Sequence, residues 1–183
     1  MSALSDLILW IWLVFWVYWL VSATRSKKNI RSTRFNKAWS FRFVIILMVV
    51  FFFPSFYKDY QVTNNELLIV IGFCLFLLGL ALSMWARLHI GRNWGMPMTK
   101  KEHPQLVTSG PYKFIRHPIY SGLLLAFLGS GLAGNTFWLT FLAFSLIYFI
   151  YSAKIEEKNM TSEFGKTYLD YKDKTKMLIP FVL

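Results

Sequence analysis

The sequence predicts an all-α fold, a polytopic membrane protein of about five transmembrane helices whose last two form a helical hairpin followed by a cytoplasmic helical tail. Hydrophobic residues make up 56% and aromatic residues 19% of the 183 positions, more than a soluble domain normally carries. The apolar residues also come in blocks with no polar face, and such helices belong in lipid or in a core larger than this chain can build. Finally, the basic residues fall almost entirely on one side of the predicted spans.

The first three spans follow from apolar runs of sufficient length. The first covers about Leu4–Val21; it lacks the basic start of a cleavable signal, and its many aromatic residues suit an anchored span. The second covers about Phe43–Tyr57 and contains Pro54, which predicts a kink or tilt near its end. The third covers about Glu66–Leu88.

The last two spans are predicted at about Pro118–Ala133 and Thr136–Ala153. Gly134 and Asn135 between them form a tight turn signal, which indicates a helical hairpin. A single re-entrant hairpin in their place would leave the sidedness of the chain unchanged.

The distribution of positive charge predicts the orientation. With five spans and the N-terminus outside, 19 of the 20 Lys and Arg residues lie on the cytoplasmic side, and only Lys58 lies outside. This is the positive-inside pattern, so the prediction is an integral membrane protein with an external N-terminus and a cytoplasmic C-terminus, which in a bacterium would lie in the inner membrane. The net charge of +11 is interpreted in the same way, and no nucleic-acid partner is expected.

Two regions follow from this layout. Residues 1–88 hold the first three spans, and residues 89–183 form the region expected to carry chemistry. The predicted cytoplasmic parts are the basic loop Ala23–Arg42, the polar loop His89–His117 and the amphiphilic tail Lys154–Leu183.

A metal site is not expected. Cys74 is the single cysteine and lies within a span, and the three histidines, His89, His103 and His117, are evenly spaced without ligand-like pairing. The sequence also contains no phosphate-binding glycine motif.

The segment from Gly110 to Tyr120 is the first candidate for function. Pro118 suits the first position of a helix, which places Arg116 and His117 at the mouth of the fourth span and Tyr120 just inside it. Polar groups at a helix N-terminus can hold an anion. The structural alternative is a helix entry with interfacial Tyr and Arg side chains.

Glu156 and Glu157 are the second candidate, at the cytoplasmic end of the fifth span. Carboxylates near a helix C-terminus oppose the helix dipole, so either the helix continues past them or a cation holds them. An ordinary salt bridge to a nearby Lys or Arg would explain them. A carboxylate at the membrane mouth could instead bind an ammonium group or a sulfonium-bearing cofactor.

Two further segments are weaker signals. Gly91–Gly95 contains Asn93 and Trp94, whose indole could stack on a base or cation or could simply anchor the chain at the interface. His103–Ser109 indicates a turn followed by an extended stretch.

Taken together, the ordered motifs resemble the isoprenylcysteine carboxyl methyltransferase family, whose pattern phospholipid and other integral membrane methyltransferases share. The resemblance covers roughly residues 85 to 183; the N-terminal half is similar only in hydropathy. The motifs are Leu106-Val107-Thr108-Ser109-Gly110-Pro111-Tyr112, Arg116-His117-Pro118-Ile119-Tyr120-Ser121-Gly122, Glu156-Glu157, Phe164-Gly165 with Tyr168 and Tyr171, and Leu178-Ile179-Pro180.

The resemblance implies a methyltransferase that uses S-adenosyl-L-methionine and a lipophilic methyl acceptor. It implies a cofactor pocket on the cytosolic side, formed by the last spans and the tail. The cofactor-binding residues implied are His103, Leu106, Val107, Tyr112, Arg116, His117, Pro118, Ile119, Tyr120 and Glu156. His103 is one residue further from the Leu-Val pair than in the family pattern.

The implied acceptor is the carboxylate of a prenylated cysteine, and one departure from the family pattern bears on its recognition. Family members carry a substrate-contacting arginine about one helical turn before the acidic pair, and here that position is Ser152. Lys154 could replace the charge, although lysine lacks the bidentate fork that suits a carboxylate. Asn93-Trp94 resembles an Asn-aromatic pair in the corresponding loop of the family, and Asn93, Trp94 and Lys154 are the predicted substrate-binding residues.

The predicted catalytic residues are His117, Glu156 and Glu157. A carboxylate acceptor needs no base, whereas a thiol or protonated amine needs one, with His117 or Glu157 as the nearest candidate. A phospholipid amine or thiol methyltransferase of the same fold, an NADPH-dependent enzyme similar to sterol reductases, and a membrane scaffold or transporter are the alternatives. The spans hold few ionisable residues to mark a transport path, and the oligomeric state is left open.

Overall fold

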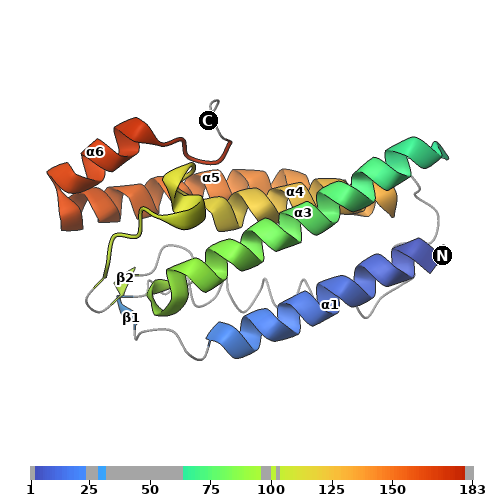
Figure 1. The fold of residues 1–183 in the computed structure, drawn as a ribbon, viewed down its shortest axis with the longest axis horizontal. Helices are drawn as coiled ribbons and strands as arrows, with labels where there is room; N and C mark the ends of the chain where they lie inside the picture. The colour runs from blue at the N-terminus through green and yellow to red at the C-terminus, as the bar shows by residue number, and fades with distance from the viewer. Residues whose placement is uncertain (1–2, 24–28, 32–63, 96–99, 102–103, 180–183) are drawn as a thin grey trace.

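The computed structural model describes residues 3–23, 29–31, 64–95, 100–101 and 104–179, and these are almost entirely helical (Figure 1). Its helices and strands are α1 (Ala3–Ala23), β1 (Asn29–Arg31), α3 (Glu66–Ile90), β2 (Lys100–Lys101), α4 (Pro118–Ala133), α5 (Phe137–Phe164) and α6 (Lys166–Lys174). Two 3-10 turns, η2 (Gly91–Asn93) and η3 (Gly110–Lys113), follow α3 and precede α4.

The predicted all-α class is confirmed, and four of the five predicted spans correspond to α1, α3, α4 and α5. The second predicted span, Phe43–Tyr57, and most of the basic loop Ala23–Arg42 lie outside the described residues. α1, α3 and α5 are long and apolar enough to cross a membrane, and α4 is a shorter apolar helix of 16 residues. The small antiparallel pairing of β1 with β2 was not predicted.

The fifth predicted span ends too early at Ala153. α5 continues for a further three turns to Phe164, because the polar stretch after Ala153 consists of residues such as Glu, Lys and Met that form helix readily in water. The helix stops at Gly165, whose φ of +53° lies in the left-handed region that favours glycine.

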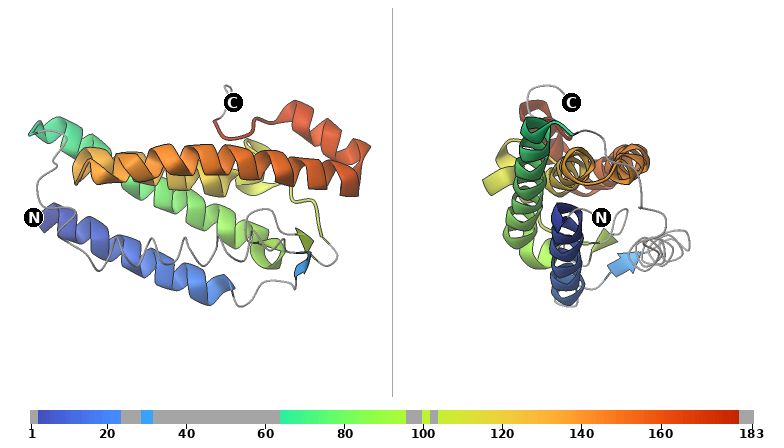
Figure 2. Two further views of the ribbon diagram at one scale, coloured as in Figure 1. Left: turned by 180° about the vertical axis from the view of Figure 1, so that it is seen from behind. Right: turned by 90° about the vertical axis from the view of Figure 1, so that its right-hand side faces the viewer.

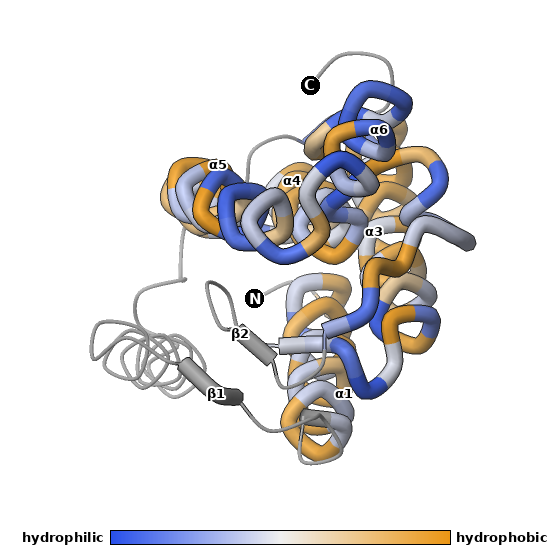
Figure 3. The backbone as a smooth tube through the Cα atoms, turned by 90° about the vertical axis from the view of Figure 1, so that its left-hand side faces the viewer, coloured by the Kyte–Doolittle hydropathy of each residue, from blue (hydrophilic) through white to orange (hydrophobic). Residues whose placement is uncertain are grey.

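Several helix ends meet at one end of the bundle. α1 and α3 run in the same direction, as the predicted layout requires of the first and third spans, whereas α4 runs back against α3 (Figures 1 and 2). Consequently the end of α1, the end of α3, the start of α4, the end of α5 and all of α6 gather at one end of the bundle (Figure 2). Figure 3, which faces this end, shows its hydrophilic stretches on α6 and on the last part of α5.

The turn between α4 and α5 lies at the opposite end and confirms the predicted helical hairpin. Gly134 caps α4 through its N–H to the carbonyl of Ser130, and the side chain of Asn135 accepts a hydrogen bond from the N–H of Phe137 at 2.8 Å. The orientation of this bundle in the membrane remains a prediction.

α3 and α4 pack with their backbones in close approach. A Cβ atom added at Gly72 would lie 2.7 Å from the backbone nitrogen of Ala133, and one at Gly79 or Gly122 would overlap the facing helix. Ser83 on α3 donates a hydrogen bond to the carbonyl of Ile119 at 3.2 Å. Small residues therefore fix how deeply α4 sits against α3, as is typical of membrane helices.

α1 contributes aromatic packing against α4 and α5. Trp12 is fully buried, stacks on Phe127 and Trp138, and donates a hydrogen bond from its indole nitrogen to Ser130 at 3.0 Å. Outward-facing apolar side chains remain highly exposed, for example Phe144 at 71% and Ile147 at 70% on α5. Such residues suit contact with lipid.

Candidate active site

The entry to α4 is built by contacts between η3 and the end of α3. Gly110 has a φ of +58°, and an added Cβ would lie 2.7 Å from the ring of His89, so only glycine allows this approach. Tyr112 is buried, and its hydroxyl donates a hydrogen bond to the carbonyl of Ala86 at 3.4 Å. Pro118 occupies the first turn of α4, as predicted.

Glu157 lies on α5 opposite this entry and binds two cations. Its Oε1 accepts a hydrogen bond from Nε of Arg116 at 2.6 Å, and its Oε2 lies 2.8 Å from Nζ of Lys172 on α6. The Glu157 side chain is only 7% exposed. The sequence left two explanations for an acidic pair at this position, and both apply. The helix α5 continues past Glu156 and Glu157, and two cations hold Glu157.

Glu156 lies beside a phenol and an imidazole. Its Oε1 accepts a hydrogen bond from the Tyr120 hydroxyl at 2.6 Å, and its Oε2 lies 3.5 Å from Nδ1 of His117. Its side chain is 23% exposed, about three times the value for Glu157. Glu156 thus keeps accessible carboxylate surface beside a phenol and an imidazole.

His117 bridges the two carboxylates. Its Nε2 lies 3.7 Å from Oε1 of Glu157, is buried, and makes no hydrogen bond within the described part of the chain. The imidazole stacks on the Tyr120 ring with centroids 5.4 Å apart, and Tyr120 stacks on Phe149 at 4.5 Å. The polar cluster therefore has an aromatic wall on the side of the apolar helices.

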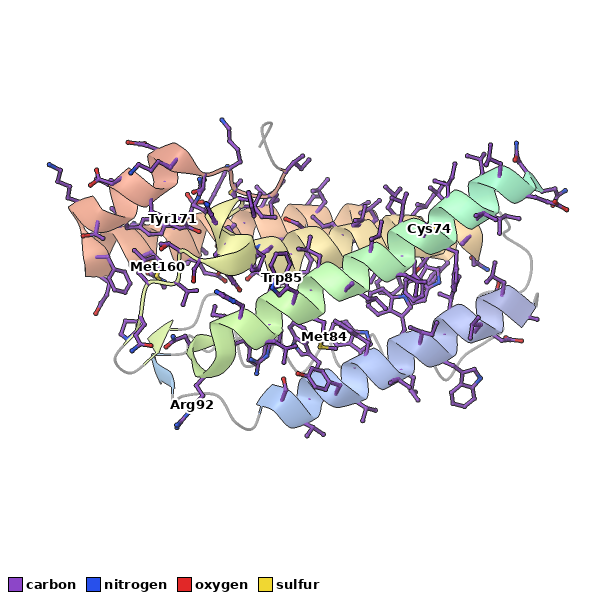
Figure 4. All side chains as sticks on the ribbon, in the orientation of Figure 1. Cys74, Met84, Trp85, Arg92, Met160 and Tyr171 are labelled. Carbon is purple, nitrogen blue, oxygen red and sulfur yellow. The ribbon has the colours of Figure 1, made fainter. Side chains whose placement is uncertain are left out.

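Residues 171–178, which we term the strap, cross the entry to α4. The backbone N–H groups of Arg116 and His117 donate to the carbonyls of Lys176 and Met177 at 2.8 and 3.1 Å. The Tyr171 hydroxyl, labelled in Figure 4, donates to the carbonyl of Tyr112 at 2.6 Å. Burial raises the pKa of Tyr171 to about 12, so the hydroxyl keeps the proton that it donates at physiological pH.

Replacement of Tyr171 by Phe tests this contact. We expect Tyr171→Phe to destabilise the chain by about 1 kcal/mol, since it leaves the Tyr112 carbonyl without this donor. Thermal unfolding in detergent measures the change. Tyr151→Phe is the control, because Tyr151 is 55% exposed on α5; an equal shift in both variants would contradict the prediction.

The remaining predicted site residues lie around this cluster or apart from it. Leu106 and Val107 are partly buried, Val107 packs against the core to which Ile119 belongs, and Pro118 is fully buried. Lys154 is exposed on α5. His103 lies outside the described residues.

Asn93 and Trp94 pack toward α1 and the end of α3. Asn93 donates a hydrogen bond to Gln105 at 3.1 Å. Trp94 is buried against Trp19 and stacks on the guanidinium of Arg87, 4.6 Å from the ring centroid. The predicted role of these two residues in substrate binding stays a prediction.

Two contributors were missed at the level of sequence. Lys172 resembles its neighbours Lys166 and Lys174 on the tail, and no local signal marks it as the one that reaches Glu157. Arg87 was counted only as a basic residue; it is 4% exposed and donates to the carbonyls of Ser22 and Gly91 at 2.7 and 2.8 Å. An arginine inside an apolar run was the available signal for a buried, paired cation.

A comparison with protein families matches residues 67–167 to the family described as phospholipid methyltransferase. This range begins in α3, contains α4 and α5, and ends in α6. It therefore includes Arg116, His117, Tyr120, Glu156 and Glu157.

Curated relatives and a solved structure agree. The chain is 26% identical over 167 residues to protein-S-isoprenylcysteine O-methyltransferase B of Arabidopsis thaliana, covering 86% of this chain and 81% of that protein. It is 39% identical over 80 residues to methanethiol S-methyltransferase 1 of Bradyrhizobium diazoefficiens, covering 43% of this chain but only 27% of that enzyme.

The solved structure is that of the eukaryotic intramembrane Ras methyltransferase ICMT, with a TM-score of 0.58 and 27% identity. The match covers 84% of this chain and 55% of that chain, so the present sequence spans about half the length of its structural relative.

Proposed function

Since the chain belongs to the phospholipid methyltransferase family, we propose that it is an integral membrane methyltransferase that uses S-adenosyl-L-methionine and acts on a lipophilic acceptor. The observation that carries the proposal is the Glu156 carboxylate, held by Tyr120 at 2.6 Å and flanked by His117 at 3.5 Å. These side chains come from two helices that meet beneath the strap, at the polar end of an otherwise apolar bundle.

The cluster fits the charge of the proposed cofactor. Arg116 and Lys172 bind Glu157, and Glu156 lies beside the Tyr120 hydroxyl and the His117 imidazole with its side chain 23% exposed. A carboxylate in this setting suits an ammonium or sulfonium group, whose charge it would balance. Tyr112, Ile119 and Tyr120 would supply the apolar and aromatic surface for the rest of the molecule.

S-adenosyl-L-methionine supplies, when bound, an electrophilic methyl group on a positively charged sulfur. The contribution of this chain is to orient the reactants and to exclude competing water. Stacking of His117, Tyr120 and Phe149 provides an aromatic wall for that purpose. If the acceptor is a thiol, Nε2 of His117 is the proposed proton acceptor, because it is buried and makes no hydrogen bond within the described residues.

Two classes of methyl acceptor are proposed, and the first is the preferred one. The relatives named for isoprenylcysteine suggest the carboxylate of a prenylated cysteine. The second candidate is a lipophilic thiol, suggested by the relatives named for methanethiol and favoured by Ser152. Ser152 is fully buried and its hydroxyl donates to the carbonyl of Tyr148 at 2.8 Å, so this position offers an acceptor carboxylate no positive charge.

Methyl transfer to defined acceptors tests the proposal. The purified chain in lipid vesicles is given methyl-labelled S-adenosyl-L-methionine with a total lipid extract, an S-prenylated cysteine, a long-chain thiol or phosphatidylethanolamine. We expect the labelled methyl group to appear in the organic phase with one class of acceptor. We also expect S-adenosylhomocysteine to stabilise the chain against unfolding. Stabilisation by NADPH without methyl transfer would favour the reductase alternative.

A further inference from the structure

The strap is joined to the segment that carries His117 at successive positions. Besides the backbone hydrogen bonds of Arg116 and His117, the hydroxyl of Ser121 donates to the carbonyl of Leu178. The Arg116 guanidinium donates to the carbonyls of Lys172, at 3.1 Å, and Thr175. The backbone position of His117 therefore depends on where the strap lies.

Glu157 ties the strap to α5. It binds Arg116 at the entry to α4 and Lys172 on the strap, so one carboxylate connects three segments that are distant in the sequence. Arg116 and Glu157 are both nearly buried, with side chains 9% and 7% exposed, whereas Lys172 is 42% exposed. The inner pair is well shielded from water, and the outer contact with Lys172 can be varied without exposing the core.

The two cations bound to Glu157 determine whether it can act as a base. Both Glu157 oxygens are committed to cations, and its Oε1 lies 3.7 Å from Nε2 of His117, beyond hydrogen-bond distance. A carboxylate held between two cations is a weak proton acceptor. Glu157 is thus poorly suited to act as the catalytic base that the sequence suggested for it.

We propose that Glu157 is a positioning residue and that Arg116, Glu157 and Lys172 form an ionic lock that holds the strap on the entry to α4, thereby fixing His117 against Glu156. The lock itself is inferred from the contacts above, and its effect on turnover rests on the proposed function. Lys172 is the part of the lock that the strap contributes.

Amide hydrogen exchange of the full chain in lipid nanodiscs tests the lock directly. The N–H groups of Arg116 and His117 bond to the strap, so their exchange reports its release. Lys172→Met should speed exchange of the peptide containing them by about three- to fivefold, as expected for a half-exposed ion pair. Lys172→Arg should restore the wild-type rate, and Lys174→Met, an exposed neighbouring lysine on α6, should leave it unchanged.

Steady-state kinetics test the positioning role. Lys172→Met should raise KM for S-adenosyl-L-methionine about three- to fivefold while kcat stays within about twofold, and Lys172→Arg should reverse the change. Glu157→Gln should act in the same direction with a larger effect, since it leaves the Arg116 cation buried beside a neutral amide. The pH profile of kcat should keep its shape in both variants.

Each contrary result has a distinct meaning. Unchanged exchange in both Lys172→Met and Glu157→Gln would overturn the lock, whatever the activity. Faster exchange with unchanged KM, or a loss of kcat and of the acidic limb of the pH profile in Glu157→Gln, would overturn the positioning role. Absence of methyl transfer by the wild-type chain would refute the proposed function alone, because the exchange measurement does not depend on it.

Discussion

Glu156→Gln should strongly reduce methyl transfer while the chain still inserts into the membrane and folds. The substitution keeps the size of the side chain, and the amide oxygen can still accept the hydrogen bond that Tyr120 donates at 2.6 Å. The negative charge is lost, and one carboxylate oxygen becomes an amide NH2 group. Removal of one partner from a shielded pair of charges costs about 2–5 kcal/mol, which corresponds to a decrease of roughly 30-fold to several thousand-fold.

The measurement is kcat/KM for labelled methyl transfer together with binding of S-adenosylhomocysteine. Glu163→Gln is the matched control, because Glu163 is an exposed glutamate two turns further along α5. Tyr120→Phe should give a smaller decrease, since it removes the donor and leaves the charge of Glu156 in place. Normal turnover of Glu156→Gln would remove this residue from the site and with it the main support for the proposed function.

The contrast between α4 and α5 shows what the sequence could predict about the fold. The bounds of α4 were predicted to the residue, because Pro118 and Gly134 are strong local signals for the start and end of a helix. The predicted end of α5 was the last apolar residue, Ala153. That residue marks the edge of the hydrocarbon layer and not the end of the helix. Hydropathy identifies a span, whereas Gly165 sets the end of this helix.

The site was predictable in composition but not in detail. His117, Tyr120 and Glu156 were expected together, and the hairpin of α4 and α5 brings them together, although Tyr120 and Glu156 are 36 positions apart. The different partners of Glu156 and Glu157 could not be inferred, because two adjacent acids give the same sequence signal. Their partners differ because consecutive residues on α5 face different segments. Glu156 faces Tyr120, and Glu157 faces Arg116 and the strap.

Gly79→Leu should prevent stable packing of α3 against α4. A Cβ at Gly79 would overlap the backbone nitrogen of Ala126 and lie 2.5 Å from the carbonyl oxygen of Gly122, and helix backbones cannot move aside as flexible side chains do. Lipid is as apolar as the helices, so close packing is a main source of their association. We expect a loss of more than about 3 kcal/mol, at or beyond the upper end of the usual cost of overpacking.

The effect should reach the site through Ser83, which lies one turn beyond Gly79 and donates to the carbonyl of Ile119 at the start of α4. Separation of the helices there would displace His117 and Tyr120 from Glu156, so activity should fall together with the melting temperature in detergent.

Gly79→Ala should give an intermediate loss. Leu78→Ala is the control, because Leu78 is 60% exposed on the outer face of α3. If Gly79→Leu melts at the wild-type temperature, the close contact between α3 and α4 does not exist in the membrane, and the placement of α4 that assembles the site would have to be abandoned.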